Sequence, residues 1–195
     1  MGQLDGKKIA ALFTDGVEQV ELDKPTESFR SEGAEVEYVT LKPGEVQAFN
    51  HLDHGDKIKV DKAVADADAS DYDGLLLPGG VANPDFLRID ENAVGFVKSF
   101  VEQAKPIAVI CHGPWTLVEA DVLNGRTITS WPSLRTDIRN AGGNWVDEQV
   151  HVDAGLVSSR KPDDLPAFTE KAIEEFAEGK HEGMAASAQG ASSAS

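Results

Sequence analysis

The chain has 195 residues, of which 41% are hydrophobic and 27% charged, values typical of a soluble globular protein. This length suits one domain with a complete core and is too short for two comfortable ones. The formal net charge of −16 argues against nucleic acid and anionic lipid as partners, because such a surface repels their phosphates.

The sequence also predicts the cellular compartment of the protein. No apolar stretch approaches the length of a membrane helix, so we expect no membrane partner. The N-terminus does not resemble a secretory signal, because its apolar run is short and an acid lies early in it. One cysteine forms no internal disulfide, which agrees with a reducing compartment. We therefore expect a cytoplasmic protein.

Strands and helices are predicted to alternate from the start of the chain. The apolar run 7–14 and the alternating stretch 34–41 predict strands, with a helix at 18–31 between them. Pro25 lies inside that helix, which predicts a kink or a late start. Residues 42–61 carry turn residues and predict a hairpin or an excursion at the edge of the sheet.

The second half of the chain continues this alternation. Buried strands are predicted at 71–80 and 106–110, and the stretches 91–105 and 113–123 predict the helices that follow them. The remaining predicted elements are a strand at 126–130, a helix at 133–143, two strands within 145–160 and an amphipathic helix at 162–180.

This order predicts an α/β domain, with a largely parallel sheet and helices on both faces. Residues 1–180 are expected to form the single domain, and the small, polar stretch 181–195 a mobile tail. Sites in such sheets gather at the carboxyl ends of strands, where three segments are expected: TDGVE at 14–18, PGG at 78–80 and CHGP at 111–114. The same edge would then carry an acid, a glycine turn and a thiol.

Cys111, the only cysteine, lies at a predicted strand-to-helix turn. Such a turn holds a nucleophile in a tight elbow, and Gly113 fits a turn without room for a side chain. The start of the next helix is expected to lower the thiol pKa from about 8.5. The alternative is an inert, buried cysteine. His112 could act as general base or acid, or could be an ordinary exposed or turn-bonded histidine.

Other candidate groups are expected at the same edge. A protonated Glu18 could donate a hydrogen bond to a thiolate and an ionised one could act as a base, although it could equally be an ordinary first-turn acid. Gly79 and Gly80 could present a backbone N–H to an oxyanion, with that of His112 as second donor, or form a simple turn. Trp131 precedes a proline at a strand end and could line a pocket.

No cofactor is expected. The segment HLDHGD at 51–56 matches no specific ligand spacing, so we interpret it as a polar loop and predict no metal. The patterns GxxxxGK[ST] and GxGxxG do not occur, so nothing indicates a nucleotide.

Several segments in this order resemble the PfpI/ThiJ superfamily. The segments are GVEQVEL, LLLPGG, PIAVICHGPWTLVEADVLNGRTIT, RNAGG and VSSRKPDDLPAF, and the resemblance covers roughly residues 7–179. The family includes PfpI-type intracellular proteases, the parkinsonism-associated redox protein, and glutathione-independent glyoxalases that are also reported as protein deglycases. The resemblance implies a flavodoxin-like sandwich, related to class I glutamine amidotransferases and usually assembled as homodimers or hexamers.

The resemblance also implies roles for individual residues. Cys111 would be the elbow nucleophile, Glu18 the acid that touches its thiol, and His112 the PfpI-type histidine beside the cysteine. Asp85 in NPDFL looks like the acid that reaches a neighbouring subunit's histidine, although the preceding loop is one residue longer than usual and Asp is shorter than Glu. Trp131 stands where the family commonly has tyrosine.

Three functions remain open. Cys111 could attack the aldehyde of methylglyoxal or glyoxal, after which Glu18 or His112 moves a proton and water releases a hydroxy acid; the same route on a glycated protein is deglycation. Alternatively, Cys111, His112 and an acid from another chain could form a peptidase triad. Third, the thiol could be a non-enzymatic redox sensor or chaperone switch. We predict the first, in a stress-protection protein.

Overall fold

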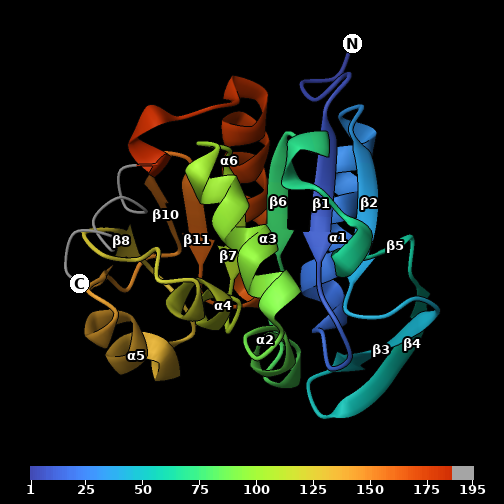
Figure 1. Cartoon of the computed structure of the whole chain (residues 1–195), viewed down its shortest axis with the longest axis horizontal. Helices are drawn as coiled ribbons and strands as arrows, with labels where there is room; N and C mark the ends of the chain where they lie inside the picture. The colour runs from blue at the N-terminus through green and yellow to red at the C-terminus, as the bar shows by residue number, and fades with distance from the viewer. Residues whose placement is uncertain (186–195) are drawn as a thin grey trace.

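A seven-stranded sheet forms the centre of the computed structural model, which describes residues 1–185 (Figure 1). All neighbouring strands are parallel except the pair at one edge, which is a hairpin. From that edge to the other, the strands are β10 (Val150–Asp153), β11 (Leu156–Ser159), β7 (Ile107–Ile110), β6 (Gly74–Leu77), β1 (Lys8–Leu12), β2 (Glu35–Thr40) and β5 (Lys62–Ala63).

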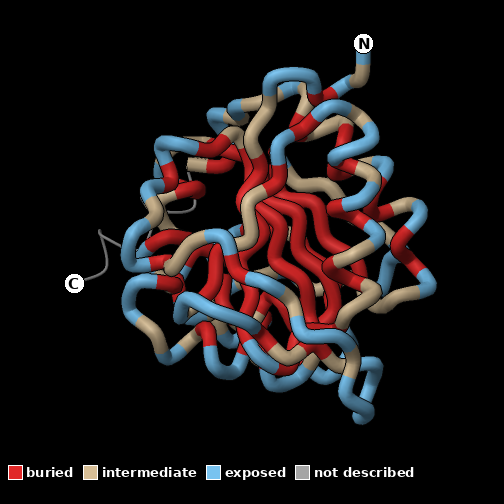
Figure 2. Tube along the Cα trace, turned by 90° about the vertical axis from the view of Figure 1, so that its right-hand side faces the viewer, coloured by how far each residue is buried: buried red, intermediate tan, exposed pale blue. Residues whose placement is uncertain are grey.

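The central strands are apolar along their whole length because both faces of the sheet are covered. β6 and β7 read GLLL and IAVI, and every one of their residues is buried. A parallel sheet between two helical layers requires such continuous apolar runs rather than alternation. Figure 2 shows these strands as a buried block at the centre of the molecule, with exposed segments around it. The predicted α/β fold with a mostly parallel sheet is confirmed.

Two helical layers cover the sheet. On one face, α1 (Gln19–Ser31) packs beside α6 (Leu165–Glu178), and the rings of Phe29 and Phe176 meet edge to face with 5.2 Å between their centroids. On the other face lie α3 (Glu91–Glu102) and α4 (Pro114–Glu119), which also contact each other (Figure 1). The short helices α2 (Ala82–Leu87) and α5 (Arg135–Asn140) adjoin α4. Within residues 1–185, no helix is long and apolar enough to cross a membrane.

The region between β2 and β5 is a separate hairpin, which confirms that prediction. β3 (Glu45–Asn50) and β4 (Asp53–Lys59) pair antiparallel with each other. The hairpin is tied to the loop between β1 and α1, because the N–H of Phe49 donates to the carbonyl of Val17 at 2.8 Å. This contact holds the hairpin over the carboxyl end of β1.

Two predictions about local structure need correction. The helix α1 begins at Gln19 and continues through Pro25, so the late start that the proline suggested does not occur. The strand expected at 126–130 is reduced to β8 (Thr127–Ile128), which pairs with β9 (Asn144–Trp145) in a two-stranded sheet outside the main one.

The beginning of the expected tail is packed against the domain. Met184 is 1% exposed and belongs to the core on the α3 side of the sheet. Its carbonyl accepts a hydrogen bond from the guanidinium of Arg126 at 2.6 Å. The expectation of a mobile tail is therefore wrong for residues 181–185, because Met184 supplies an apolar anchor; residues 186–195 lie outside the described part of the chain.

Replacing Met184 with alanine tests this docking. Met184→Ala should lower the free energy of unfolding by about 2 kcal/mol or more, because it empties a buried site in the core. Urea denaturation would measure the change, with Leu52→Ala as control because Leu52 is 92% exposed. Equal stability of the two variants would contradict the docked position of residues 181–185.

Candidate active site

Cys111 lies in a strained turn between β7 and α4. Its φ of +63° is in the left-handed region that non-glycine residues rarely adopt. The turn is fixed by its backbone, since the N–H of Cys111 donates to the carbonyl of Ser159 at 3.1 Å and that of Gly113 to the carbonyl of Ile110 at 2.9 Å. A side chain at Gly113 would lie 2.8 Å from the carbonyl oxygen of Leu77, so glycine is required there. The geometry is that of a nucleophile elbow.

His112 is close enough to the thiol to exchange a proton with it. Its Nδ1 lies 3.1 Å from Sγ of Cys111, although adjacent side chains often point apart. Two tryptophans hold the imidazole: Trp131 stacks on it with 5.9 Å between ring centroids, and Trp115 meets it edge to face at 5.3 Å. Burial lowers the pKa of His112, so the ring is neutral at pH 7 and free to accept a proton.

The acid at the thiol is Glu21, not Glu18. The carboxyl of Glu21 is within hydrogen-bonding reach of Cys111, and its Oε2 accepts the backbone N–H of Gly79 at 2.8 Å. Its Oε1 is buried without a hydrogen-bond partner. Burial, aided by the nearby charge of Glu18, raises the pKa of Glu21 to about 8. The carboxyl is therefore mostly protonated at pH 7 and can donate a hydrogen bond to sulfur.

Glu18 has a different place at the same site. It precedes the first residue of α1, and its carboxylate accepts the backbone N–H of His51 at 3.0 Å. One turn further along, Glu21 shares the buried face of the helix with Leu22 and Phe29. An acid on a mostly apolar helix face was the sequence signal for Glu21, and the assignment of the thiol contact to Glu18 is corrected accordingly.

The thiol of Cys111 is not a ready-made thiolate. Burial raises the pKa of Cys111, and the charge of an ionised Glu21 would raise it further. The expected lowering by the next helix does not occur, because Cys111 is only 7% exposed and α4 has six residues. The thiol is therefore protonated at rest, and a base must take its proton before it can act as a nucleophile.

Two backbone N–H groups surround the sulfur. Those of Gly80 and His112 point at Sγ and favour negative charge there. They are the pair expected to face an oxyanion, whereas the N–H of Gly79 is already used by Glu21. Gly79 has another function: a Cβ there would lie 2.7 Å from Cβ of Cys111, so its lack of a side chain permits the close approach.

A pocket of about 470 Å³ opens onto these groups. The hairpin supplies one wall through Phe49, His51 and Leu52, which sequence reasoning did not assign to the site. Trp131 lines another wall and is 39% exposed, as expected for a pocket residue. The remaining lining residues are Gly16, Glu18, Glu21, Gly80, Val81, Ala82, Cys111, His112 and Pro162.

Asp85 does not reach this pocket within one chain. It lies on α2 with its side chain 56% exposed, and it pairs with Arg88 at 3.3 Å. The guanidinium of Arg88 in turn lies over the ring of Trp115, 4.8 Å from the centroid. A catalytic role for Asp85 would need a second subunit and stays a prediction.

Comparisons with known proteins agree with this architecture. The family model described as "DJ-1/PfpI family" matches residues 7–175. The chain is 44% identical over 167 residues to "Putative cysteine protease YraA" of Bacillus subtilis (strain 168), covering 86% of this chain and 96% of that protein. It is 40% identical over 168 residues to "Protein/nucleic acid deglycase 2" of Escherichia coli (strain K12), with the same coverage, 86% and 96%.

A solved structure matches as well. The two-domain protein of Anabaena variabilis ATCC 29413, described as containing DJ-1/ThiJ/PfpI-like and ferritin-like domains, superposes with a TM-score of 0.82 and 33% identity. The match covers 87% of this chain and 48% of that one, so this chain spans about half of the two-domain protein.

The contact between Glu21 and the thiol can be tested by alkylation. Glu21→Gln should lower the apparent pKa of Cys111, because it removes the negative charge that raises it above pH 8. Iodoacetamide modification between pH 6 and 11 reports this one site, since Cys111 is the only cysteine. Glu18→Gln is the matched control and should have the smaller effect. An unchanged or raised pKa in Glu21→Gln would contradict the contact.

Proposed function

Because the chain belongs to the DJ-1/PfpI family, we propose that Cys111 is the nucleophile of an enzyme that acts on reactive dicarbonyls and on their adducts with proteins. One observation carries this proposal: a single thiol has a neutral imidazole and a protonated carboxyl as neighbours, inside a small pocket. The deglycase name of the Escherichia coli relative supports it. We extend the proposal to a role in stress protection in the cytoplasm.

The first step of the proposed reaction forms a hemithioacetal. Nδ1 of His112 takes the thiol proton as the sulfur attacks the aldehyde carbon of methylglyoxal. The carbonyl oxygen gains negative charge and accepts hydrogen bonds from the N–H groups of Gly80 and His112. A proton from the imidazolium or from Glu21 then neutralises this oxygen.

The second step moves hydrogen between the two carbons. A base, either His112 or the ionised carboxylate of Glu21, removes the proton on the carbon bonded to sulfur, and an enediol forms. Reprotonation at the neighbouring carbon gives a thioester of lactic acid. Water then cleaves the C–S bond, which releases lactate and restores the Cys111 thiol. The sum is methylglyoxal plus water to lactate, so no external oxidant or reductant is needed.

A peptidase is the second candidate, because Cys111 and His112 form a thiol–imidazole pair and the Bacillus subtilis relative has a protease name. It would need Asp85 of one subunit to approach His112 of another. Phe86 and Ile89, which lie beside Asp85 and are 47% and 79% exposed, would favour an interface there. The homodimer or hexamer expected from the sequence would provide it. The pocket of about 470 Å³ suits a small carbonyl better than an extended peptide.

A redox sensor is the least favoured function. Oxidation by peroxide requires an accessible thiolate. Cys111 is 7% exposed and its pKa is raised by burial, so both conditions work against rapid oxidation at rest.

Methylglyoxal turnover tests the proposal directly. The reduced protein should form lactate, Cys111→Ser should lose this activity, and Glu21→Gln should lose about 100-fold in kcat if its carboxyl takes part in proton transfer. Glu18→Gln, which keeps the acid at the thiol, should retain more activity than Glu21→Gln. Absence of lactate with the wild-type protein, together with cleavage of casein that Asp85→Asn abolishes, would favour the peptidase instead.

The pH profile provides a separate test of the two acid–base groups. Activity should rise as His112 loses its proton, below the usual histidine pKa because burial lowers it. It should fall again near pH 8, where the carboxyl of Glu21 ionises and its charge opposes the thiolate. Glu21→Gln should lack this alkaline limb. A limb that persists unchanged in the variant would show that another group causes it.

A further inference from the structure

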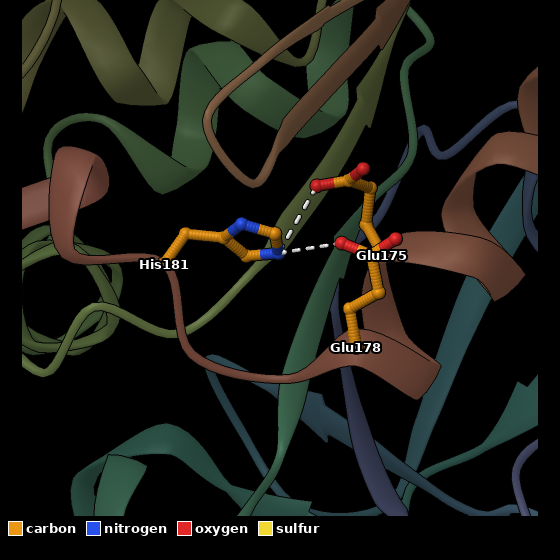
Figure 3. A group of neighbouring side chains, drawn as sticks. All are labelled: Glu175, Glu178 and His181. Atoms are coloured by element: carbon orange, nitrogen blue, oxygen red, sulfur yellow. Dashed lines mark ion pairs between the residues drawn. The ribbon is translucent and has the colours of Figure 1, made fainter.

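A second group of chemically active side chains lies near the amino end of β7, whereas Cys111 lies at the carboxyl end of the same strand. It consists of Glu175 and Glu178 in the last turn of α6 and His181 just after it (Figure 3). The N–H of His181 donates to the carbonyl of Ala104, which precedes β7, whereas Cys111 follows that strand. None of the three side chains lines the Cys111 pocket.

The local chain geometry brings the three side chains together. Glu175 and Glu178 are three residues apart on a helix, so their side chains are neighbours on its surface. The helix ends at Glu178, and Gly179, with φ of +88°, turns the chain back. His181 then points its ring toward both carboxylates, as Figure 3 shows.

The distances fit a small divalent cation. Nε2 of His181 lies 3.1 Å from Oε2 of Glu175 and 3.9 Å from Oε2 of Glu178, and one ligand atom from each residue lies within 4.8 Å of the others. Zinc binds nitrogen and oxygen at about 2.0–2.1 Å in tetrahedral sites, which separates its ligand atoms by about 3.3–3.5 Å. Small side-chain movements would therefore complete such a site.

Two of these atoms lack a hydrogen-bond partner. Oε2 of Glu175 and Nε2 of His181 are both buried and lie 3.1 Å apart, which is an ion pair when the imidazole is protonated; neither atom has a hydrogen-bond partner. Buried polar atoms are costly when unpaired, and they are rare enough in native structures to need an explanation. A cation between them would pair both lone pairs at once. The lack of hydrogen-bond partners is a separate observation from the closeness of the three side chains, because it concerns how two buried atoms are oriented.

The imidazole is held in place by its surroundings. The backbone of His181 is fixed by its 2.8 Å hydrogen bond to Ala104, and its ring packs on Gly155. A Cβ at Gly155 would lie 2.9 Å from Cδ2 of the ring, so only glycine leaves room for the imidazole there. A ligand that is positioned before the metal arrives loses little entropy on binding.

We propose that Glu175, Glu178 and His181 bind a divalent cation of the zinc type, with water in the fourth position. Imidazole with carboxylate oxygens is a donor set that zinc accepts, and three protein ligands leave one position open. The site joins α6 to the segment that follows it and lies away from the thiol, so its role is to hold residues 181–185 against the domain. It differs from the sequence-based expectation of no metal and is independent of the proposed reaction.

Zinc titration of the full chain tests the site. All variants carry Cys111→Ser, which removes the only thiol that could compete for zinc. Isothermal titration calorimetry should give one saturable equivalent of zinc per chain and a higher Tm when zinc is present. His181→Gln and Glu178→Gln should each weaken zinc binding at least tenfold. Glu178 is 66% exposed, so its replacement should not disturb folding.

His151→Gln is the matched control. His151 makes a similar histidine–glutamate pair, 2.8 Å from Glu148, but it is not part of the three-residue group. This variant should bind zinc as the Cys111→Ser parent does. The proposal is overturned if no saturable binding occurs, if His181→Gln and Glu178→Gln bind like the parent, or if His151→Gln weakens binding equally. The pair of His181 and Glu175 would then be a simple ion pair formed by protonation of the imidazole.

Discussion

The reactive site depends on the absence of a side chain at Gly79. A Cβ at this position would lie 2.7 Å from Cβ of Cys111 and 2.5 Å from Oε2 of Glu21, closer than packed atoms approach. The end of β6 therefore lies directly against both the elbow after β7 and the first turns of α1. The N–H of the same glycine holds the Glu21 carboxyl in position. One glycine thus sets the distance between an acid on one element and a thiol on another.

The acid that this packing buries changes the chemistry of the thiol. A carboxylate beside a buried sulfur would oppose its ionisation, but burial keeps the carboxyl of Glu21 mostly protonated at pH 7. In that state it donates a hydrogen bond instead of repelling negative charge. The ionisation of Cys111 and that of Glu21 each oppose the other, so the titrations of the two groups are coupled. In the proposed reaction, the thiol would lose its proton when substrate arrives rather than be held permanently as a thiolate.

Local patterns predicted the fold and the thiol, but not the partners that tertiary packing brings to them. The buried strands β6 and β7 follow from their short, continuous apolar runs. The elbow at Cys111 follows from its place directly after β7 and from Gly113 two residues later. Choosing Glu21 over Glu18 required the position of each acid around α1. Both are buried, but Glu21 lies on the helix face beside the thiol, whereas Glu18 precedes the helix and accepts the N–H of His51. The hairpin wall and the docked Met184 depend on contacts between distant segments, which no local pattern contains.

The charge of the pocket bears on which carbonyl compounds the proposed reaction could use. No lysine or arginine is among its lining residues in the described part of the chain, whereas Glu18 and Glu21 both line it. The Glu18 carboxylate is 7% exposed and is held by the N–H of His51. A keto acid would bring a second carboxylate into this space without a cation to pair it, at a cost in desolvation. For the proposed reaction, the arrangement would therefore favour neutral dicarbonyls, and adducts on amino groups, over substrates that carry their own negative charge.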